Sequence, residues 1–457
     1  MTRGITRFWA AAAIAASVPA AHAGTLVDLY SLAVQNDLTM QQLAATRDAA
    51  VEASPRAWSA VFPQVTGIAY VRSNRRTGTS KDANDPAATG TVLDETYGSS
   101  GVSLTLSQTV FDWSAFTGVS GARKQVAQAE AAYSSAEQNL IVRLVAAYFG
   151  VLSAQDTLRA DLDAQSGYKQ QLDSLQESFK TGVAPVTDLK NAQAAYDAGS
   201  ATVLLDQTAL AAAKRALAVM VGRPIGSIDP LRDEIVLAPP SPSDVESWAR
   251  TASSDNPDVI SAHFASEAAN SATSSAFGKH FPTLDVVGSY GNSNTNSRFG
   301  NDVVNNYIGL QLQWNIFTGG AVMSGVRSAE AQEAQANAAY QLALRTADQN
   351  VRNHFDGVVN GIATVNAASS AMTSQQSSVL ATEVGVKTGI RSIIDSLVAR
   401  QALTAAQKAL STARYGYLAS LLSLKSDVGQ LTRKDLEDVD RMLIAAPSTG
   451  RTLPPQR

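Results

Sequence analysis

Residue types that often do chemistry are sparse in this chain and do not cluster. Three histidines follow a predicted N-terminal leader, at His263, His280 and His354, and none stands in H-E-x-x-H or another close pair of metal ligands. The absence of cysteine excludes disulfides, thiolate metal sites and cysteine nucleophiles. The sequence contains no G-x-S-x-G motif, P-loop or dinucleotide fingerprint. We therefore predict no enzyme activity, no catalytic or metal site and no cofactor.

The composition limits the classes of partner. The 457 residues include 36 Lys+Arg and 40 Asp+Glu, which gives a formal net charge of −4. Because these charges are scattered and slightly acidic, the chain is a poor candidate for nucleic-acid binding. A hydrophobic content of 45% is enough for a core and makes global disorder a poor explanation.

Residues 1–23 have the three parts of a secretory signal peptide. Arg3 and Arg7 form a positive region, residues 8–18 a short apolar run, and Ala21-His22-Ala23 an A-x-A cleavage site. The sequence therefore predicts an exported protein. No uninterrupted apolar run long enough to cross a membrane as a helix follows, so we expect any membrane insertion to use strands.

Alternation of apolar and polar residues predicts four strands, near 64–72, 101–111, 283–290 and 307–317, with exposed loops at 73–96 and 291–305. Strands of about ten residues with one apolar face are typical of transmembrane barrels. The predicted lipid-facing residues are Val102, Leu104, Leu106, Val110, Ile308, Leu310, Leu312, Trp314 and Ile316. Four strands cannot close a barrel around a useful lumen, so several chains must contribute. The alternative is a soluble, half-buried sheet.

Between these strands the sequence favours long helices. Residues 113–181 and 320–387 are free of proline and rich in Ala, Gln and Ser, and shorter helices are predicted at 188–221 and 393–428. The last of these carries apolar residues at steps of three and four from Leu403 to Val428, the pattern of coiled-coil packing. Helices with such narrow apolar seams need neighbours, and we expect other copies of the chain to supply them.

Three landmarks recur in order at nearly constant spacing, which predicts a duplicated unit of about 200 residues. They are Phe62-Pro63 with Phe281-Pro282, Val110-Phe111 with Ile316-Phe317, and 180–188 with 387–395. The predicted organisation is a first repeat at 24–221, a proline-rich linker at 222–243, a second repeat at 244–430 and a C-terminal tail at 431–457. Each repeat begins with a helix.

Aromatic side chains gather where strands are predicted to meet helices. Trp113, Phe116 and Phe317 occupy such junctions, together with Trp314. An interfacial aromatic belt at a membrane surface has this character. Ordinary packing between two layers is the alternative.

Several motifs together resemble the TolC-like outer-membrane efflux and secretion proteins of Gram-negative bacteria. They include Asn256-Pro257-Asp258-Val259, the strand-to-helix junctions at 110–113 and 316–320, and Gly389-Ile390-Arg391-Ser392-Ile393-Ile394-Asp395. The resemblance covers about 25–435. It implies a mixed α and β membrane protein, internally duplicated and trimeric. Each chain would give four strands to one twelve-stranded transmembrane β-barrel, continued by a long periplasmic α-helical coiled-coil barrel.

The resemblance also implies a gate at the periplasmic entrance. Family members hold this entrance shut with bonds between helices, and the matching positions here are Thr187, Asp188 and Arg391. Asp395 matches the first of two acids that form a constricting ring, whereas Val398 stands at the second position. Val386 stands where the family has a tyrosine, so one latch contact is missing or replaced. The competing interpretation of Asp188 and Asp395 is capping of helix N-termini.

The function implied is export of proteins by type I secretion, or of small molecules by multidrug efflux, across the periplasm and outer membrane. The implied partners are two further copies of the chain, outer-membrane lipid, a periplasmic adaptor protein and an inner-membrane transporter, either ABC-type or proton-driven. The alternative is an exported trimeric coiled-coil adhesin or envelope spacer without a lumen. The polar inner faces of the strands and the duplication favour the channel.

Overall fold

The computed structural model describes residues 25–80, 91–232, 234–297 and 302–443. The predicted signal peptide therefore lies outside the described residues. The chain forms two compact units: one contains residues up to Gln41, Glu137–Ala249 and residues from Asn350 onward, and the other contains Gln42–Ala136 and Arg250–Gln349. These units do not coincide with the two predicted repeats, because each takes residues from both.

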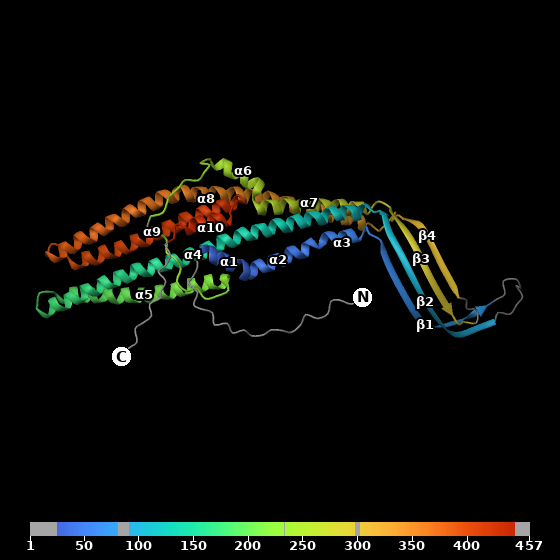
Figure 1. The fold of residues 1–457 in the computed structure, drawn as a ribbon, viewed down its shortest axis with the longest axis horizontal. Helices are drawn as coiled ribbons and strands as arrows, with labels where there is room; N and C mark the ends of the chain where they lie inside the picture. Colours follow the sequence, from blue (N-terminus) through green and yellow to red (C-terminus); the bar gives the residue numbers. More distant parts are fainter. Residues whose placement is uncertain (1–24, 81–90, 233, 298–301, 444–457) are drawn as a thin grey trace. The chain divides into compact units, whose positions relative to one another are not determined.

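The second unit contains a four-stranded antiparallel sheet in the order β1-β2-β3-β4 (Figure 1). The strands are β1 (Gln64–Ser80), β2 (Thr91–Phe111), β3 (Thr283–Thr295) and β4 (Val303–Gln313). Parts of the predicted loops at 73–96 and 291–305 are strand. Pairing of β1 with β2 continues from Gln64↔Ser107 to Ser80↔Thr91, so backbone hydrogen bonds extend these strands where apolar alternation has ended.

Helices make up most of the remaining described chain. They are α1 (Leu26–Asn36), α2 (Leu38–Val51), α3 (Ala53–Ser59), α4 (Trp113–Lys180), α5 (Val186–Val221), α6 (Val245–Asp255), α7 (Pro257–Gly278), α8 (Ala321–Lys387), α9 (Ile393–Asp427) and α10 (Arg433–Asp440). The four long helices predicted from the sequence are present, and α5 begins two residues earlier than expected. In the first unit, α5 returns beside α4 and α9 returns beside α8, which makes two helical hairpins (Figure 1).

The core of the first unit forms around the middle of α4. Leu140, Leu144 and Tyr148 are essentially inaccessible to solvent. The Tyr148 hydroxyl donates a hydrogen bond to the carbonyl of Asp229 at 2.9 Å, and burial raises the pKa of this phenol far above its usual value. Within the described residues, α4 is the one helix long and apolar enough to cross a membrane by composition alone. Its apolar side chains pack in this core, as those of a core helix in a soluble protein would.

The predicted linker at 222–243 contains no helix in its described residues, and hydrogen bonds attach it to the core. The hydroxyl of Tyr417 accepts a hydrogen bond from the Ala238 amide and donates one to the Ala238 carbonyl, both at 2.9 Å. Tyr417 is 2% exposed.

The prediction that 431–457 is a C-terminal tail is wrong for its first part. Residues 433–440 form α10, in which Leu436 and Val439 are buried. The carboxylate of Asp440 accepts hydrogen bonds from the amides of Leu26 and Val27, at 2.8 and 3.1 Å, and so satisfies the first amides of α1. Residues 444–457 lie outside the described residues.

Candidate functional sites: an amphipathic sheet and two helical hairpins

One face of the sheet is apolar on all four strands. The register places Val65 opposite Leu106, and it pairs Leu310 with Val286 and Leu312 with Leu284. The apolar residues that share this face are Val65, Ala69, Val71, Val102, Leu104, Leu106, Leu284, Val286, Tyr290, Val304, Ile308, Leu310 and Leu312. Ile308 and Leu310 are 77% and 72% exposed. A continuous exposed apolar surface of this kind marks contact with lipid or with another protein.

The opposite face of the same sheet is largely polar. Its polar members include Gln64, Thr66, Arg72, Ser103, Thr105, Ser107, Asp285, Ser289, Asn305, Gln311 and Gln313. Ile68, Tyr70, Val287, Val303 and Tyr307 are the larger apolar or aromatic exceptions on this face. A sheet with one apolar and one polar face, both open, fits a wall between lipid and water.

Three of the predicted lipid-facing residues do not hold regular strand positions. β3 begins at Thr283, which pairs with Gln313 of β4. Trp314 and Ile316 come after Gln313 and have no partner on β3, so β4 ends before them. The Trp314 indole instead donates to the carbonyl of His280 at 3.1 Å. Val110 lies at an irregularity between Thr109 and Phe111 where the register with β3 shifts.

Aromatic rings cluster where the sheet meets the helices of its unit. The rings of Trp113 and Phe281 meet edge to face at 6.2 Å, and Phe277 contacts Phe281 in the same way at 5.7 Å. Gly278 permits this approach, since a Cβ there would lie 2.6 Å from the Trp113 ring. Phe116 is 40% exposed and Phe317 is 88% exposed, so a role at a membrane interface stays a prediction for both.

The two hairpins turn in the same way. In the first, the chain leaves α4 through Gly182 at φ 73°, and in the second it leaves α8 through Gly389 at φ 76°. The amides of Val183 and Ile390 donate to carbonyls five residues earlier, at 2.9 and 2.8 Å. A positive φ is the conformation that glycine adopts without strain, so both turns depend on their glycine. This shared geometry supports the predicted duplication.

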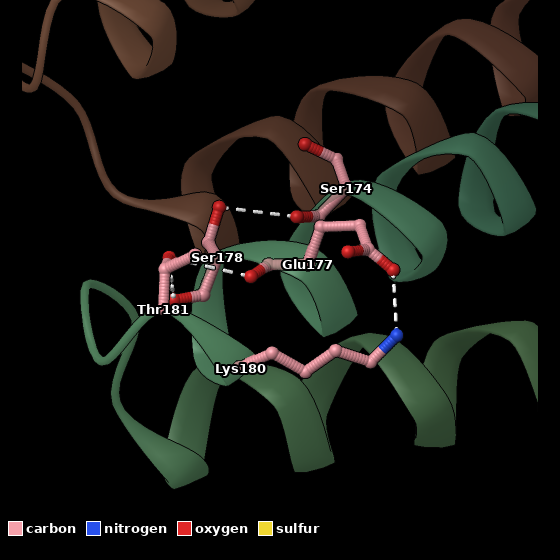
Figure 2. A network of polar contacts seen from close by, with 5 residues as sticks. All are labelled: Ser174, Glu177, Ser178, Lys180 and Thr181. Carbon is pink, nitrogen blue, oxygen red and sulfur yellow. Dashed lines mark hydrogen bonds and ion pairs between the residues drawn. The ribbon is translucent and has the colours of Figure 1, made fainter.

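The last turns of α4 carry a polar network that stays within the helix (Figure 2). Lys180 pairs with Glu177 at 2.7 Å, and the hydroxyls of Ser178 and Thr181 donate to main-chain carbonyls of the same helix. These contacts stabilise the end of α4 without linking it to a neighbour.

Beside the turns lies a cleft of about 720 Å³ that contains two of the three predicted latch residues. Asp188 from the first hairpin and Arg391 from the second both line it, as does Val386, whereas Thr187 is exposed and does not. Within the described chain, Asp188 and Arg391 form no ion pair with one another. The cleft therefore brings the predicted partners to one place without joining them.

Of Asp188 and Asp395, for which helix capping was the competing interpretation, only Asp395 caps a helix with its side chain. Asp395 forms a capping box with Ser392, in which each side chain accepts from the other residue's amide at 3.1 Å. Asp188 lies in the first turn of α5, whose N-cap is Pro185 and has no side-chain cap. A cap contributes about 1 kcal/mol to helix stability. Asp395 remains partly exposed while it caps α9, so capping does not exclude a further role.

A link between helices that the sequence did not reveal crosses the same cleft. Arg400 of α9 forms an ion pair with Glu383 of α8. The Arg400 guanidinium lies against Gly167 of α4, where a Cβ would be 2.1 Å from Nη1. Arg400 therefore contacts both hairpins at once. Charge and spacing alone could not identify this pair, because the two residues are 17 positions apart on different helices.

Apolar contacts below the cleft hold the start of α9 to the first hairpin. Leu397 packs with Ala164 and Tyr168 of α4, and Ile393 packs against a second cluster that contains Leu172 and Leu175. Apolar contacts attract without a preferred direction, whereas the Arg400–Glu383 ion pair and the cap of α9 are directional. The apolar side chains therefore hold α9 against α4, and the polar contacts fix its orientation.

Further along the hairpins, two acids and a lysine meet between three helices. Asp161 of α4 pairs with Lys408 of α9, and Asp206 of α5 lies close enough to Asp161 to be affected by its charge. Burial, and then the neighbouring Asp161, raise the pKa of Asp206 to about 6, against the opposing effect of Lys408. One oxygen of Asp206 is buried without a hydrogen-bond partner. The ionised form of Asp206 therefore lowers the free energy of unfolding.

In the part of the chain that the structure describes, no group of three or more His, Cys, Asp or Glu is placed to hold a metal ion. His354, one of the three histidines considered above, instead contacts Asp427 at 2.5 Å.

Comparison with known proteins places these features in a family. The family model described as outer membrane efflux protein matches residues 29–223 and 248–430. The chain is 29% identical over 440 residues to the outer membrane protein TolC of Vibrio cholerae, which covers 95% of this chain and 97% of that protein. It is 28% identical to the alkaline protease secretion protein AprF of Pseudomonas aeruginosa, over 93% of this chain and 89% of that one.

Solved structures show the same fold. The CmeC outer membrane channel of Campylobacter jejuni matches with a TM-score of 0.77 at 18% identity, covering 92% of this chain and 90% of that one.

The raised pKa of Asp206 predicts a pH-dependent stability. Its folded-state pKa lies above the usual carboxyl value, so protonation stabilises the fold as pH falls through about 6, and the ionised form is destabilising above it. We expect Asp206→Asn to raise the melting temperature by a few degrees at pH 8, with a much smaller gain at pH 5, in calorimetry of the detergent-solubilised protein. Asp197→Asn, exposed on the same helix, is the control and should give no such pH-dependent gain. Equal gains for Asp206→Asn at both pH values would contradict this explanation.

Proposed function

The chain belongs to the outer membrane efflux protein family, and from that premise we propose that three copies close a single twelve-stranded barrel around a polar lumen. The protein is an exit channel of the Gram-negative outer membrane, in a family of channel and transport proteins. Its four strands would form one third of the barrel, and its long helices would continue the passage as a coiled-coil tunnel through the periplasm.

The observation that carries this proposal is the sheet, with its two contrasting faces and two open edges. The apolar face suits lipid and the polar face suits an aqueous lumen. Among the strands that the structure describes, β1 and β4 each leave one edge of the sheet unpaired. Lipid offers no partner for backbone amides and carbonyls, so such edges must pair with other strands. Neighbouring copies supply these strands, with β4 of one chain beside β1 of the next.

We propose that the helical hairpins deliver cargo from an inner-membrane transporter, ABC-type or proton-driven, through a periplasmic adaptor protein. A relative named for secretion of alkaline protease supports proteins as cargo, and the efflux name of the family supports small molecules. The channel itself performs no catalysis in this proposal. A lumen-free adhesin would need neither the polar face of the sheet nor the shared turn geometry of the hairpins.

The cleft between the hairpin ends would then be the gate. Asp188 and Arg391 face it from different hairpins, with Thr187 next to Asp188, and Arg400 bridges Glu383 and α4. The contact of Arg400 with α4 and the attraction between the opposite charges of Asp188 and Arg391 would both weaken when the hairpins separate, so an adaptor that moves one hairpin could open the cleft. Asp395 would add a single ring of carboxylates at the entrance, without a second acid at Val398.

The orientation of the sheet is tested by placing one charge on either face. Arginine on the lipid face of a barrel costs about 2–4 kcal/mol at the bilayer midplane and less toward the interfaces, so we expect Leu310→Arg to destabilise the membrane form. Gln311→Arg, the next residue on β4, points to the polar face and is the matched control. Trimer yield in purified outer membranes should fall sharply for the first variant and stay near the parent level for the second. Equal yields would contradict the assignment of the apolar face to lipid.

The gate is tested by single-channel conductance in planar bilayers. Asp188→Ala with Arg391→Ala, and separately Glu383→Ala with Arg400→Ala, should raise the conductance several-fold. The first pair removes opposite charges that line the cleft from different hairpins, and the second removes the Arg400 side chain that reaches from α9 to α4. Lys180→Ala breaks an ion pair of similar chemistry that lies within α4 and should leave the conductance unchanged. If both double variants conduct like the parent, these residues do not form the latch.

A further inference from the structure

The polar face of the sheet is almost free of charge. Over 64–74, 99–109, 283–295 and 303–313, its residues are Ser, Thr, Asn, Gln, Gly and a few apolar or aromatic residues, apart from two. Those two are Asp285 and Arg72. The apolar face carries no charged residue over the same stretch of sheet.

The two charges lie at opposite ends of this stretch. Asp285 is the third residue of β3, beside the helical end of the sheet, where Thr109 and Gln311 are its cross-strand neighbours. Arg72 lies opposite Ser99, which lies opposite Thr295. Asp285 and Thr295 are ten residues apart on β3, so the two charges are about 34 Å apart along the strands. The Debye length is about 8 Å at physiological ionic strength, so each charge acts on its own surroundings.

Neither charge is cancelled by a direct cross-strand neighbour. Ser99 is neutral, and the Arg72 guanidinium lies over the Tyr70 ring at 4.4 Å, which holds it against the wall of the sheet. The next charges along the hairpin offset one another: Arg76 lies opposite Glu95, and Arg75 pairs with Asp94 at 2.9 Å on the other face. Among the described strand residues of the polar face at this end, the net charge is therefore that of Arg72.

We propose that the lumen of the barrel is bipolar, with Asp285 making its helical end selective for cations and Arg72 making its outer end selective for anions. This inference rests on the proposed closure of the sheet with its polar face inward. In a trimer each residue becomes a ring of three like charges around a wall that is otherwise neutral. An ion or a charged segment of cargo then meets opposite preferences at the two ends of the barrel.

The natural absence of cysteine gives a direct test. Ser99→Cys and Thr109→Cys place a reporter thiol directly across from Arg72 and Asp285, at about 5 Å between Cβ atoms. Trimers in lipid vesicles are treated with an anionic (sulfonatoethyl) or a cationic (trimethylammonium-ethyl) methanethiosulfonate, and the ratio of the two labelling rates is measured. One unit charge at this distance changes the ratio about threefold at 0.1 M salt.

Each charge should set the preference of the thiol opposite it. We expect Arg72→Gln to lower the preference of the Ser99→Cys thiol for the anionic reagent about threefold. Asp285→Asn should lower the preference of the Thr109→Cys thiol for the cationic reagent to a similar extent. Arg72→Lys should preserve the parent ratio, which separates loss of charge from loss of structure. Arg75→Gln removes a nearby positive charge from the other face and is the matched control, and all shifts should shrink at 1 M salt.

Two failures are distinguishable. Ratios that do not respond to Arg72→Gln or Asp285→Asn, or that respond equally to Arg75→Gln, would overturn the bipolar lumen while leaving the barrel intact. If both reporter thiols are as protected from the reagents as the thiol of a Leu310→Cys variant on the apolar face, the polar face does not line water, and the proposed barrel fails with it.

Discussion

The two unpaired edges of the four-stranded sheet are the feature on which the proposed membrane form of this protein depends. A sheet with one apolar face is stable in lipid only if its backbone groups are paired throughout. In the described part of the chain, β1 and β4 each have one side without a partner strand. Polar alternation on the second face gives the closed form an aqueous interior. The proposed closure by further copies of the chain would supply the missing hydrogen bonds, a lipid-facing surface and a lumen at once.

A second constraint acts on the helices. Their apolar seams are narrow, and the hairpins are joined by a mixture of small apolar clusters and single polar links, such as Leu397 with Tyr168 and Lys408 with Asp161. An entrance held mainly by broad apolar burial would be difficult to open, whereas directional contacts between charged groups can be exchanged for contacts with a partner at modest cost. The glycines at the turns adopt the positive φ that these turns require, and Gly167 allows the close approach of Arg400 to α4.

Sequence patterns predicted the parts of this fold that local rules determine. Period-two alternation located all four strands, and the proline-free windows located the long helices. The extensions of β1 and β2 were missed because they depend on pairing between polar residues, and the end of β4 was misplaced because its partner strand stops there. The helix α10 and the Arg400–Glu383 pair depend on tertiary contacts that leave no local signal. Resemblance identified Asp188 and Arg391, and the structure brings both to one cleft without pairing them.

The number of chains in the membrane form tests the closure of the sheet most directly. Native mass spectrometry of the detergent-extracted protein, released from its outer-membrane fraction without cross-linking, counts the copies in one particle. We expect three copies, because three four-stranded sheets complete the proposed barrel. A particle of one or two chains that remains integrated in the membrane would contradict it, since its sheet edges would then be closed by some other means.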